Sequence, residues 1–126
     1  MKMRALIVDD DPLARQRIRR LSDEEPDLEI AGECANGAEA VDQIRRQPPD
    51  LLLLDVQMPG IDGFQVLRRL PAELLPVVII TTASDEYAVR AFEVHALDYL
   101  LKPVSRERFK AAIERVRKKL ARRKET

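Results

Sequence analysis

The stretch Leu51-Leu52-Leu53-Leu54-Asp55 decides the fold of this chain. Its four consecutive leucines show no polar alternation, and a short apolar run of this kind predicts a strand that is covered on both faces. Such strands belong to parallel sheets with helices packed on either side. The aspartate comes directly after the run, so we expect it at the carboxyl end of the strand, where open α/β sheets bind their ligands.

Strand and helix signals alternate along the rest of the chain. Apolar runs predict five strands, at residues 4–8, 28–33, 51–54, 77–82 and 98–101. Helical spacing and capping residues predict five helices, at about residues 12–25, 38–46, 64–70, 84–94 and 105–123. This alternation predicts the α/β class, with one parallel sheet and helices on both faces.

Three of these helices show an apolar face in the sequence, and in the helix at 38–46 it consists of Ala40, Val41 and Ile44. In the first helix the face is expected to consist of Leu13, Ile18 and Leu21. In the last helix the apolar residues are spaced by threes and fours; they are Phe109, Ala112, Ile113, Val116 and Leu120. Aromatic residues make up only 4% of the chain and tryptophan is absent. The core must therefore consist mainly of Leu, Val, Ile and Ala.

Length and composition fit one globular domain. The chain has 126 residues, 45% hydrophobic and 35% charged, and its 22 basic residues balance 22 acidic ones. A net charge of zero gives no general indication of nucleic-acid or membrane binding. Residues 106–126 nevertheless hold ten Lys or Arg against three Asp or Glu. This basic tail predicts a solvated helix face, and contact with an acidic partner or nucleic acid is the alternative.

Cys34 is the only cysteine, so an internal disulfide and a cysteine-based metal site are both excluded. Residues 1–8 are too short for a signal peptide, and no apolar run is long enough to cross a bilayer. We therefore predict a cytoplasmic protein without membrane contact. Cys34 is expected to be a small buried hydrophobe, and the single histidine, His95, to be a structural residue at a helix end.

Residues that carry chemistry lie at the ends of four predicted strands. In chain order they are Asp9, Asp10, Asp11, Asp55, Thr81, Thr82 and Lys102. The carboxyl ends of parallel strands meet at one edge of the sheet, so these side chains should lie together. Two carboxylates about 5 Å apart repel by roughly 3 kcal/mol at an effective dielectric constant of about 20. The cluster should therefore raise the pKa of one carboxyl or bind a hard cation such as Mg²⁺ or Mn²⁺.

Asp55 is the best candidate for a nucleophile, because it would lie in the middle of this edge and carboxylates form aspartyl phosphates. A transferring phosphoryl group needs positive charge and hydrogen-bond donors at its oxygens. Mg²⁺ and Lys102 would supply the charge, Thr82 a hydroxyl and Ala83 a backbone N–H. Each residue also has an ordinary structural explanation, such as a helix cap, a strand residue or a surface turn. Their joint placement at four strand ends favours the functional interpretation.

The residues resemble the receiver domain of two-component response regulators over essentially the whole chain. The segments that carry the resemblance are LIVDD (6–10), LDVQMPGIDG (54–63), TTA (81–83) and DYLLKP (98–103). Residues 12–15 and 85–102 are most similar to receivers of the LytTR (LytR/AlgR) subfamily. The resemblance implies a flavodoxin-like (βα)5 fold, also called CheY-like, that is doubly wound around a five-stranded sheet.

The family resemblance implies phosphotransfer from a phosphohistidine on a sensor histidine kinase to Asp55. It implies that Mg²⁺ is bound directly by Asp10, Asp55 and the backbone carbonyl of Gln57, with Asp9 acting largely through water. Gln57 and Ser84 would flank the path of the hydrolytic water and tune the lifetime of the phosphoryl group. The chain would catalyse only its own phosphotransfer and dephosphorylation, and would not be an enzyme in any wider sense.

The same resemblance implies how the signal is transmitted. Thr82 and Lys102 would hold the phosphoryl group, and Tyr99 would turn inward when Thr82 moves toward it. The Lys102–Pro103 peptide would be cis, a state that only proline makes accessible at low cost. Without the resemblance, packing is the preferred explanation for Tyr99.

The output is expected to lie outside these residues. In this subfamily it is usually a DNA-binding LytTR domain that controls transcription, so contact with DNA would occur only through that domain. We expect the receiver domain at residues 1–120, with residues 121–126 as the start of a basic linker or a truncation point. A homodimer that depends on phosphorylation is expected through the fourth helix, the fifth strand and the fifth helix.

Four rival functions stay open at this point. An aspartyl-phosphate phosphatase would need an acid–base residue two positions after the nucleophile, where this chain has Gln57. A flavin-binding domain of the same fold would need a phosphate loop after the first strand, where Asp9, Asp10 and Asp11 would repel phosphate. A module that is never phosphorylated is disfavoured by the complete acidic, hydroxyl and ammonium set. A stand-alone receiver that acts through protein contacts is the main alternative.

Overall fold

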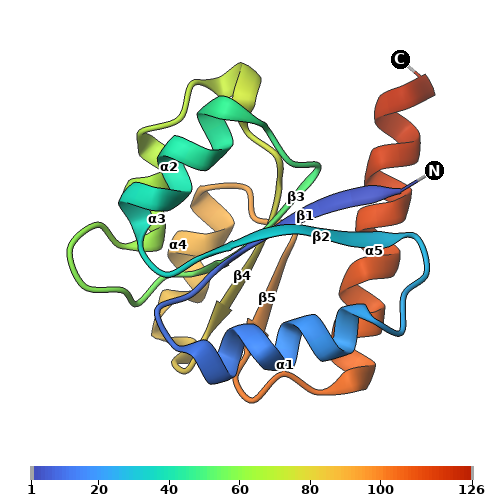
Figure 1. Cartoon of the computed structure of the whole chain (residues 1–126), viewed down its shortest axis with the longest axis horizontal. Coiled ribbons are helices and arrows are strands. Elements are labelled where there is room, and N and C mark those ends of the chain that lie inside the picture. The colour runs from blue at the N-terminus through green and yellow to red at the C-terminus, as the bar shows by residue number, and fades with distance from the viewer. Residues whose placement is uncertain (1, 126) are drawn as a thin grey trace.

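The computed structural model describes residues 2–125, which form a five-stranded parallel sheet covered by helices on both faces (Figure 1). The strands are β1 (Met3–Val8), β2 (Leu28–Cys34), β3 (Leu51–Asp55), β4 (Val77–Thr82) and β5 (Asp98–Leu101). The helices are α1 (Pro12–Ser22), α2 (Gly37–Arg46), α3 (Gly63–Arg68), α4 (Ala88–Glu93) and α5 (Arg106–Glu125), with two 3-10 turns, η1 (Ala72–Leu74) and η2 (Asp85–Tyr87). The strand order is β2-β1-β3-β4-β5, and all neighbouring pairs are parallel. The predicted flavodoxin-like (βα)5 fold is confirmed.

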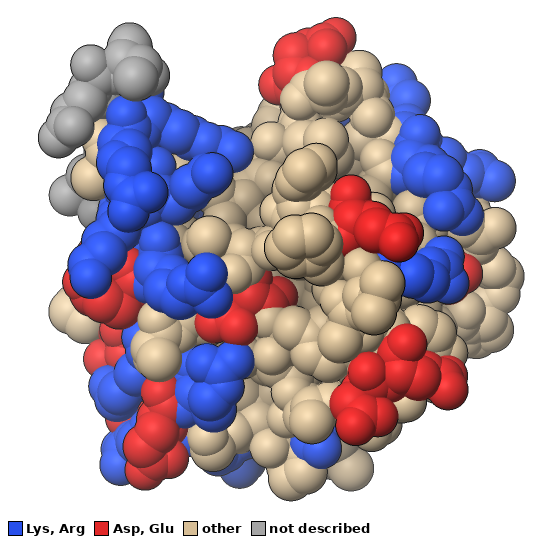
Figure 2. Space-filling model, turned by 180° about the vertical axis from the view of Figure 1, so that it is seen from behind, with Lys and Arg blue, Asp and Glu red and all other residues tan. Residues whose placement is uncertain are grey.

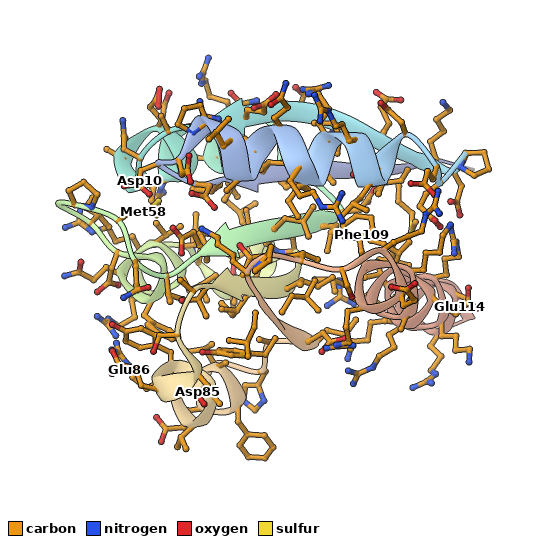
Figure 3. The ribbon with its side chains drawn as sticks, turned by 90° about the horizontal axis from the view of Figure 1, so that it is seen from below. Asp10, Met58, Asp85, Glu86, Phe109 and Glu114 are labelled. Atoms are coloured by element: carbon orange, nitrogen blue, oxygen red, sulfur yellow. The ribbon has the colours of Figure 1, made fainter. Side chains whose placement is uncertain are left out.

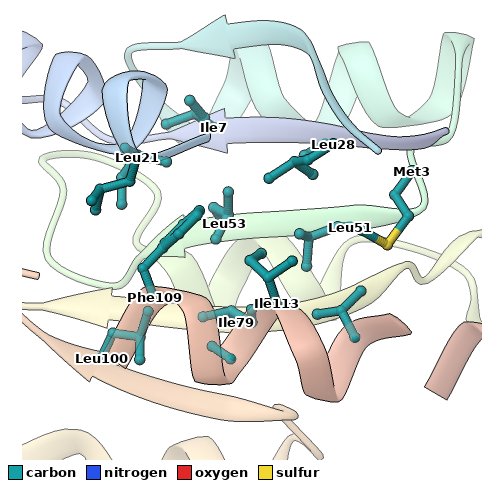
Figure 4. Packing of buried hydrophobic residues seen from close by; sticks show 14 of the residues in the cluster. Met3, Ile7, Leu21, Leu28, Leu51, Leu53, Ile79, Leu100, Phe109 and Ile113 are labelled. Carbon is teal, nitrogen blue, oxygen red and sulfur yellow. The ribbon is translucent and has the colours of Figure 1, made fainter. Parts of the chain in front are cut away.

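The leucine run of β3 alternates between two cores although it contains no polar residue. Leu51 and Leu53 pack into the core shared with α1 and α5, whereas Leu52 and Leu54 pack into the core shared with α2, α3 and α4. Figure 4 shows the first core, in which Phe109 of α5 lies against the sheet. Successive side chains of a strand point to opposite faces. A strand covered on both faces therefore needs an apolar residue at every position, which explains the run.

The loops that follow β1 and β3 pass directly into helices and cap them. Asp11 caps α1, where its side chain accepts a hydrogen bond from the Leu13 N–H at 2.9 Å and Pro12 occupies the first helical position. Asp62 and Gln65 form a reciprocal capping box at the start of α3. Each cap holds its loop at the carboxyl edge of the sheet.

The prediction for α1 was wrong at two points. Leu13 is 73% exposed, whereas Ile18 and Leu21 are buried. In an α-helix, Leu13 lies about 140° around the axis from Ile18, so the two side chains cannot share one face. The helix also ends at Ser22 and does not continue to Glu25, whose buried carboxylate instead contacts α5.

The fourth helix is shorter than the segment 84–94 that the sequence predicts. Ser84 caps the 3-10 turn η2, and α4 that follows has only six residues. His95 has a φ of 60° and follows Val94, the C-cap of α4, so it lies at a helix end as predicted. Within α4, Ala91 is buried, but Phe92 is 83% exposed. The helix is therefore held to the sheet by few apolar side chains.

α5 carries the basic tail along one side of the molecule, at the left of Figure 2. The helix continues through Glu125, so residues 121–125 are helical, and Thr126 lies outside the described residues. Its predicted apolar stripe is buried from Phe109 to Val116. Cys34 is also buried, as predicted. Among residues 2–125, no helix is both long enough and apolar enough to cross a membrane.

Candidate phosphoacceptor site

Loops from several strands meet at the carboxyl edge of the sheet. Asp9 and Asp10 follow β1, Asp55 ends β3, and each offers a carboxylate oxygen within 4.8 Å of the other two. Asp9 and Asp55 are buried, whereas Asp10 is exposed. Figure 3 labels Asp10 and Met58 at the same end of the molecule, opposite Glu114 of α5. Asp11 of the predicted run does not join the cluster, because its carboxylate caps α1.

Lys102 is the cation that faces this cluster. Its ammonium nitrogen lies 2.7 Å from Asp9 Oδ2 and 3.5 Å from Asp55 Oδ2. The backbone N–H of Lys102 donates to the Thr82 carbonyl at 2.8 Å, which fixes the loop after β5 beside β4. One ammonium thus serves a group of three carboxylates, so the site retains an excess of negative charge.

Burial and a like-charged neighbour change the protonation of Asp55. Loss of hydration, followed by repulsion from Asp9, raises the pKa of Asp55 to about 6, although Lys102 and the Gln57 N–H oppose the change. Burial alone would lower the pKa of Lys102, but the hydrogen bond to Asp9 and the charge of Asp55 raise it. Lys102 therefore stays protonated over the range in which Asp55, with a pKa of about 6, titrates.

The donor set fits a hard divalent cation. Mg²⁺ and Mn²⁺ prefer oxygen ligands, and Mg²⁺ usually keeps several waters beside one or two carboxylates. The carboxylates of Asp9, Asp10 and Asp55 converge within 4.8 Å, and the exposure of Asp10 leaves room for water on that side. Gln57 lies in the loop that follows Asp55, and its backbone N–H donates to Asp55 Oδ1 at 3.1 Å. A bound cation would relieve the repulsion that raises the pKa of Asp55.

The end of β4 brings hydroxyl and backbone donors to the same edge. Thr81 pairs with Asp55 in the sheet register, so Thr82 lies one residue further toward the edge. The Thr82 side chain is fully buried, and its hydroxyl accepts a hydrogen bond from the Ser84 N–H at 3.4 Å. Ala83 between them is exposed. These three residues thus lie at the carboxyl end of β4, next to the strand that ends in Asp55.

β5 and the loop after it contribute the two remaining predicted residues, Tyr99 and Pro103. Tyr99 is half-buried against the core under α4, and its hydroxyl donates to the backbone carbonyl of Ser84. The Lys102–Pro103 peptide is cis. Tyr99 therefore lies behind the loop that carries Thr82 and Ser84, and not at the acidic cluster itself.

Gly63 packs against the backbone of Asp55. A Cβ atom at position 63 would lie 2.6 Å from the Asp55 carbonyl oxygen, closer than any side chain tolerates. The Gly63 N–H also donates to the Val56 carbonyl at 3.2 Å. Glycine at this position therefore lets the first turn of α3 rest on the end of β3.

Tyr87 is a residue of the site that the sequence did not indicate. Its hydroxyl accepts a hydrogen bond from Gln57 Nε2 at 3.4 Å, across a sequence separation of 30 residues. Its ring centroid lies 6.2 Å from that of Phe64, at an interplanar angle of 50°. No local pattern links positions 57 and 87, so only the fold could reveal this contact.

The fold and this edge define a class of protein. The family model of the response regulator receiver domain matches residues 5–114. The chain belongs to this family and is a receiver domain of a two-component response regulator. Receiver domains generally bind Mg²⁺ in an acidic pocket and work with sensor histidine kinases.

Several curated proteins are similar in sequence. The transcriptional regulatory protein BtsR of Salmonella typhi is 47% identical over 115 residues, which cover 91% of this chain and 48% of that protein. BtsR of Escherichia coli K12 is 45% identical, with the same coverage of both chains. An uncharacterized response regulatory protein of Shewanella oneidensis is 44% identical over 91% of this chain and 49% of its own length. The chain thus spans about half the length of these relatives.

Solved structures agree with this assignment. The receiver domain of AraT from Geobacillus stearothermophilus superposes with a TM-score of 0.89 at 32% identity, over 98% of this chain and 99% of that one. The response regulatory domain of MrkE from Klebsiella pneumoniae superposes with a TM-score of 0.86 at 28% identity, over 95% and 99% of the two chains.

Proposed function

We propose that Asp55 accepts a phosphoryl group from the phosphohistidine of a sensor histidine kinase. The observation that carries the proposal is the position of Asp55, which is 2% exposed at the end of the central strand and lies 3.5 Å from Lys102. An oxygen of the Asp55 carboxylate attacks phosphorus, the bond between phosphorus and the histidine nitrogen breaks, and the imidazole leaves with that electron pair. The product is an aspartyl phosphate.

The neighbouring residues stabilise the charge of the phosphoryl group. Lys102 faces the oxygens with its ammonium, Thr82 donates its hydroxyl, and Ala83 donates its backbone N–H. Mg²⁺ or Mn²⁺, when bound, supplies further positive charge to the phosphoryl oxygens. The residues that would hold the metal are Asp9, largely through water, Asp10, Asp55 and the backbone carbonyl of Gln57. Gln57 and Ser84 would tune the lifetime of the aspartyl phosphate from positions beside the path of water.

The phosphorylated domain would signal through α4, β5 and α5. Thr82 would move toward the phosphoryl group and Tyr99 would turn inward, and the thin apolar packing of α4 supports such a change. A homodimer through this face would follow. The similarity of residues 85–102 to LytTR receivers supports an output domain that regulates transcription. The BtsR relatives support it as well, because they are named transcriptional regulatory proteins and the matched segment covers only 48% of their length. In this proposal the receiver occupies residues 1–120, a linker begins at 121–126, and DNA is bound only by the output domain.

The test is phosphorylation by acetyl phosphate with Mg²⁺, followed by mass spectrometry of the intact protein. We expect one added phosphoryl group in the wild type and none in Asp55→Asn. Asp42→Asn is the matched control, because Asp42 is a surface aspartate of α2 and should leave labelling unchanged. Equal labelling of Asp55→Asn would contradict the proposal. Continuous phosphate release from added monoesters would favour a phosphatase instead.

A further inference from the structure

We infer that Tyr87 is a positioning residue that holds the side chain of Gln57 on Thr82 while Asp55 is unphosphorylated; this inference rests on the proposed function. The Thr82 hydroxyl donates to Gln57 Oε1 at 3.3 Å, and Gln57 Nε2 donates to the Tyr87 hydroxyl at 3.4 Å. The three side chains come from the end of β4, the loop after β3 and the end of η2. The carboxamide is thus bound at both of its polar atoms.

The hydrogen of the Thr82 hydroxyl is already in use in this arrangement. A threonine hydroxyl has one hydrogen to donate, and here Gln57 Oε1 accepts it. The proposed contact between Thr82 and a phosphoryl oxygen needs the same hydrogen. Gln57 and the phosphoryl group therefore compete for Thr82, and any group that strengthens the hold of Gln57 favours the resting state.

Tyr87 is suited to this role because its ring is fixed by other contacts. The ring packs against Phe64, which is 1% exposed. The guanidinium of Arg90 in α4 lies 4.0 Å from the centroid of the same Phe64 ring. The hydroxyl is consequently presented to Gln57 from a packed support that includes α3 and α4. If Gln57 were released from Thr82, the change would be transmitted to α4 through the contacts of Tyr87 with Phe64 and of Phe64 with Arg90. Tyr99 is linked to the loop after β4 by a separate contact, its hydrogen bond to the Ser84 carbonyl.

The inference is tested with beryllofluoride, a phosphoryl mimic, in the presence of Mg²⁺. Tyr87→Phe keeps the ring and removes only the hydroxyl, and Gln57→Met keeps the length of the side chain and the backbone carbonyl. Compared with the wild type, we expect beryllofluoride to bind about threefold more tightly to Tyr87→Phe and about fivefold more tightly to Gln57→Met. Factors of this size correspond to the loss of one hydrogen bond that competes for Thr82. In a Gln57→Met background, Tyr87→Phe should add nothing, because Tyr87 acts only through Gln57.

Tyrosine fluorescence distinguishes the inferred role of Tyr87 from simple packing, because a residue that only packs would show no change that depends on Gln57. The chain has two tyrosines and no tryptophan, so in Tyr99→Phe all tyrosine emission comes from Tyr87. We expect this emission to change when beryllofluoride is added to Tyr99→Phe. The change should be lost when Gln57→Met is added to the same variant.

Three outcomes would count against the inference. It would be overturned by equal affinity in Tyr87→Phe and the wild type, or by an undiminished gain from Tyr87→Phe in the Gln57→Met background. A fluorescence change that persists without the Gln57 amide would overturn it as well. If the wild type failed to bind beryllofluoride at all, the proposed function would fall and this inference with it.

Discussion

Two groups of carboxylates at opposite ends of the sheet have opposite electrostatics. At the carboxyl edge, Asp9, Asp10 and Asp55 converge on one ammonium, and the pKa of Asp55 is raised to about 6. Near the start of β2, Glu25 and Asp27 meet two cations of α5. The pKa of both carboxyls is lowered there, because hydrogen bonds to α5 outweigh the effect of burial.

The second group, which we call the α5 clamp, consists of Glu25, Asp27, Lys110 and Arg117. Arg117 Nη2 lies 2.7 Å from Glu25 Oε1 and 2.7 Å from Asp27 Oδ1, and Arg117 Nε lies 2.8 Å from Asp27 Oδ2. Lys110 Nζ lies 2.9 Å from Glu25 Oε2. Glu25 and Asp27 therefore each contact at least one cation, and the clamp joins segments 85 to 92 residues apart in sequence. The same two cations also reach two more exposed carboxylates, Glu24 at 3.8 Å from Lys110 and Glu114 at 3.1 Å from Arg117.

The difference distinguishes a structural ion-pair group from a binding site. In the clamp every charge has a partner, so the charges stabilise the fold they belong to. At the carboxyl edge the carboxylates outnumber the cation, so the fold holds them together at a cost that a bound cation would offset. Composition does not reveal this contrast, because both groups contain the same kinds of residue.

The largest expected effect comes from removing the excess charge with Asp55→Asn in metal-free buffer. The pKa of Asp55 is about 6 in the folded state against 3.8 for the free group, so the wild type loses stability as the pH rises from about 4 to 6. We expect the variant to be more stable by up to about 3 kcal/mol near pH 8, and equal to the wild type below the pKa of the free group. Urea unfolding across this pH range measures the difference. If Asp55→Asn were less stable than the wild type at pH 8, the conclusion that Asp55 lies in a cluster with excess negative charge would be contradicted.

Removal of a cation from the α5 clamp is expected to lower the stability of the protein, whereas Asp55→Asn is expected to raise it. Arg117→Met keeps most of the aliphatic stem and leaves Glu25 and Asp27 with fewer partners, so we expect a loss of about 2 kcal/mol at neutral pH. The folded-state pKa of both carboxyls is lowered, so this contribution is present above about pH 4.5 and disappears as the pH falls. Unfolding at neutral and acid pH measures this trend.

A matched control for the clamp is Asp42→Asn. Asp42 and Arg46 form an ion pair at 2.9 Å, but their side chains are 67% and 68% exposed. The substitution should change the free energy of unfolding by less than about 0.5 kcal/mol. A loss as large as that of Arg117→Met would mean that burial does not distinguish the clamp from a surface pair.

Apart from the surface control, the smallest expected effect is the response to Mg²⁺. At ten times its dissociation constant, Mg²⁺ should stabilise the wild type by about 1.4 kcal/mol, because it binds only the folded cluster. Asp10→Asn removes one carboxylate of the cluster and should lose most of this gain, whereas Arg117→Met should keep it. Thermal unfolding with Mg²⁺ and with a chelator measures the gain in stability that Mg²⁺ gives to each variant. A gain in Asp10→Asn equal to that of the wild type would contradict a metal site at Asp10.

The sequence by itself determined the alternation of strands with helices, the parallel pairing of the strands and the edge of the sheet at which the candidate site lies. Four uninterrupted leucines require cover on both faces, and the alternation of strands with helices requires parallel pairing. Asp55 follows the run directly, so its place at the carboxyl edge was predictable from local pattern. The same holds for Asp9, Thr82 and Lys102, which lie within a residue of their strand ends.

Only the tertiary structure decided which of these groups interact. Asp11 is adjacent to Asp10 in sequence, yet it caps α1 and stays outside the cluster. The exposure of Leu13 follows from its angle around α1, and the short α4 from the 3-10 turn that precedes it. Tyr87 reaches Gln57 across 30 residues, and Arg117 reaches Glu25 across 92. Local periodicity specifies which face of an element is apolar, whereas the balance of charge at a point depends on distances that exist only after the chain has folded.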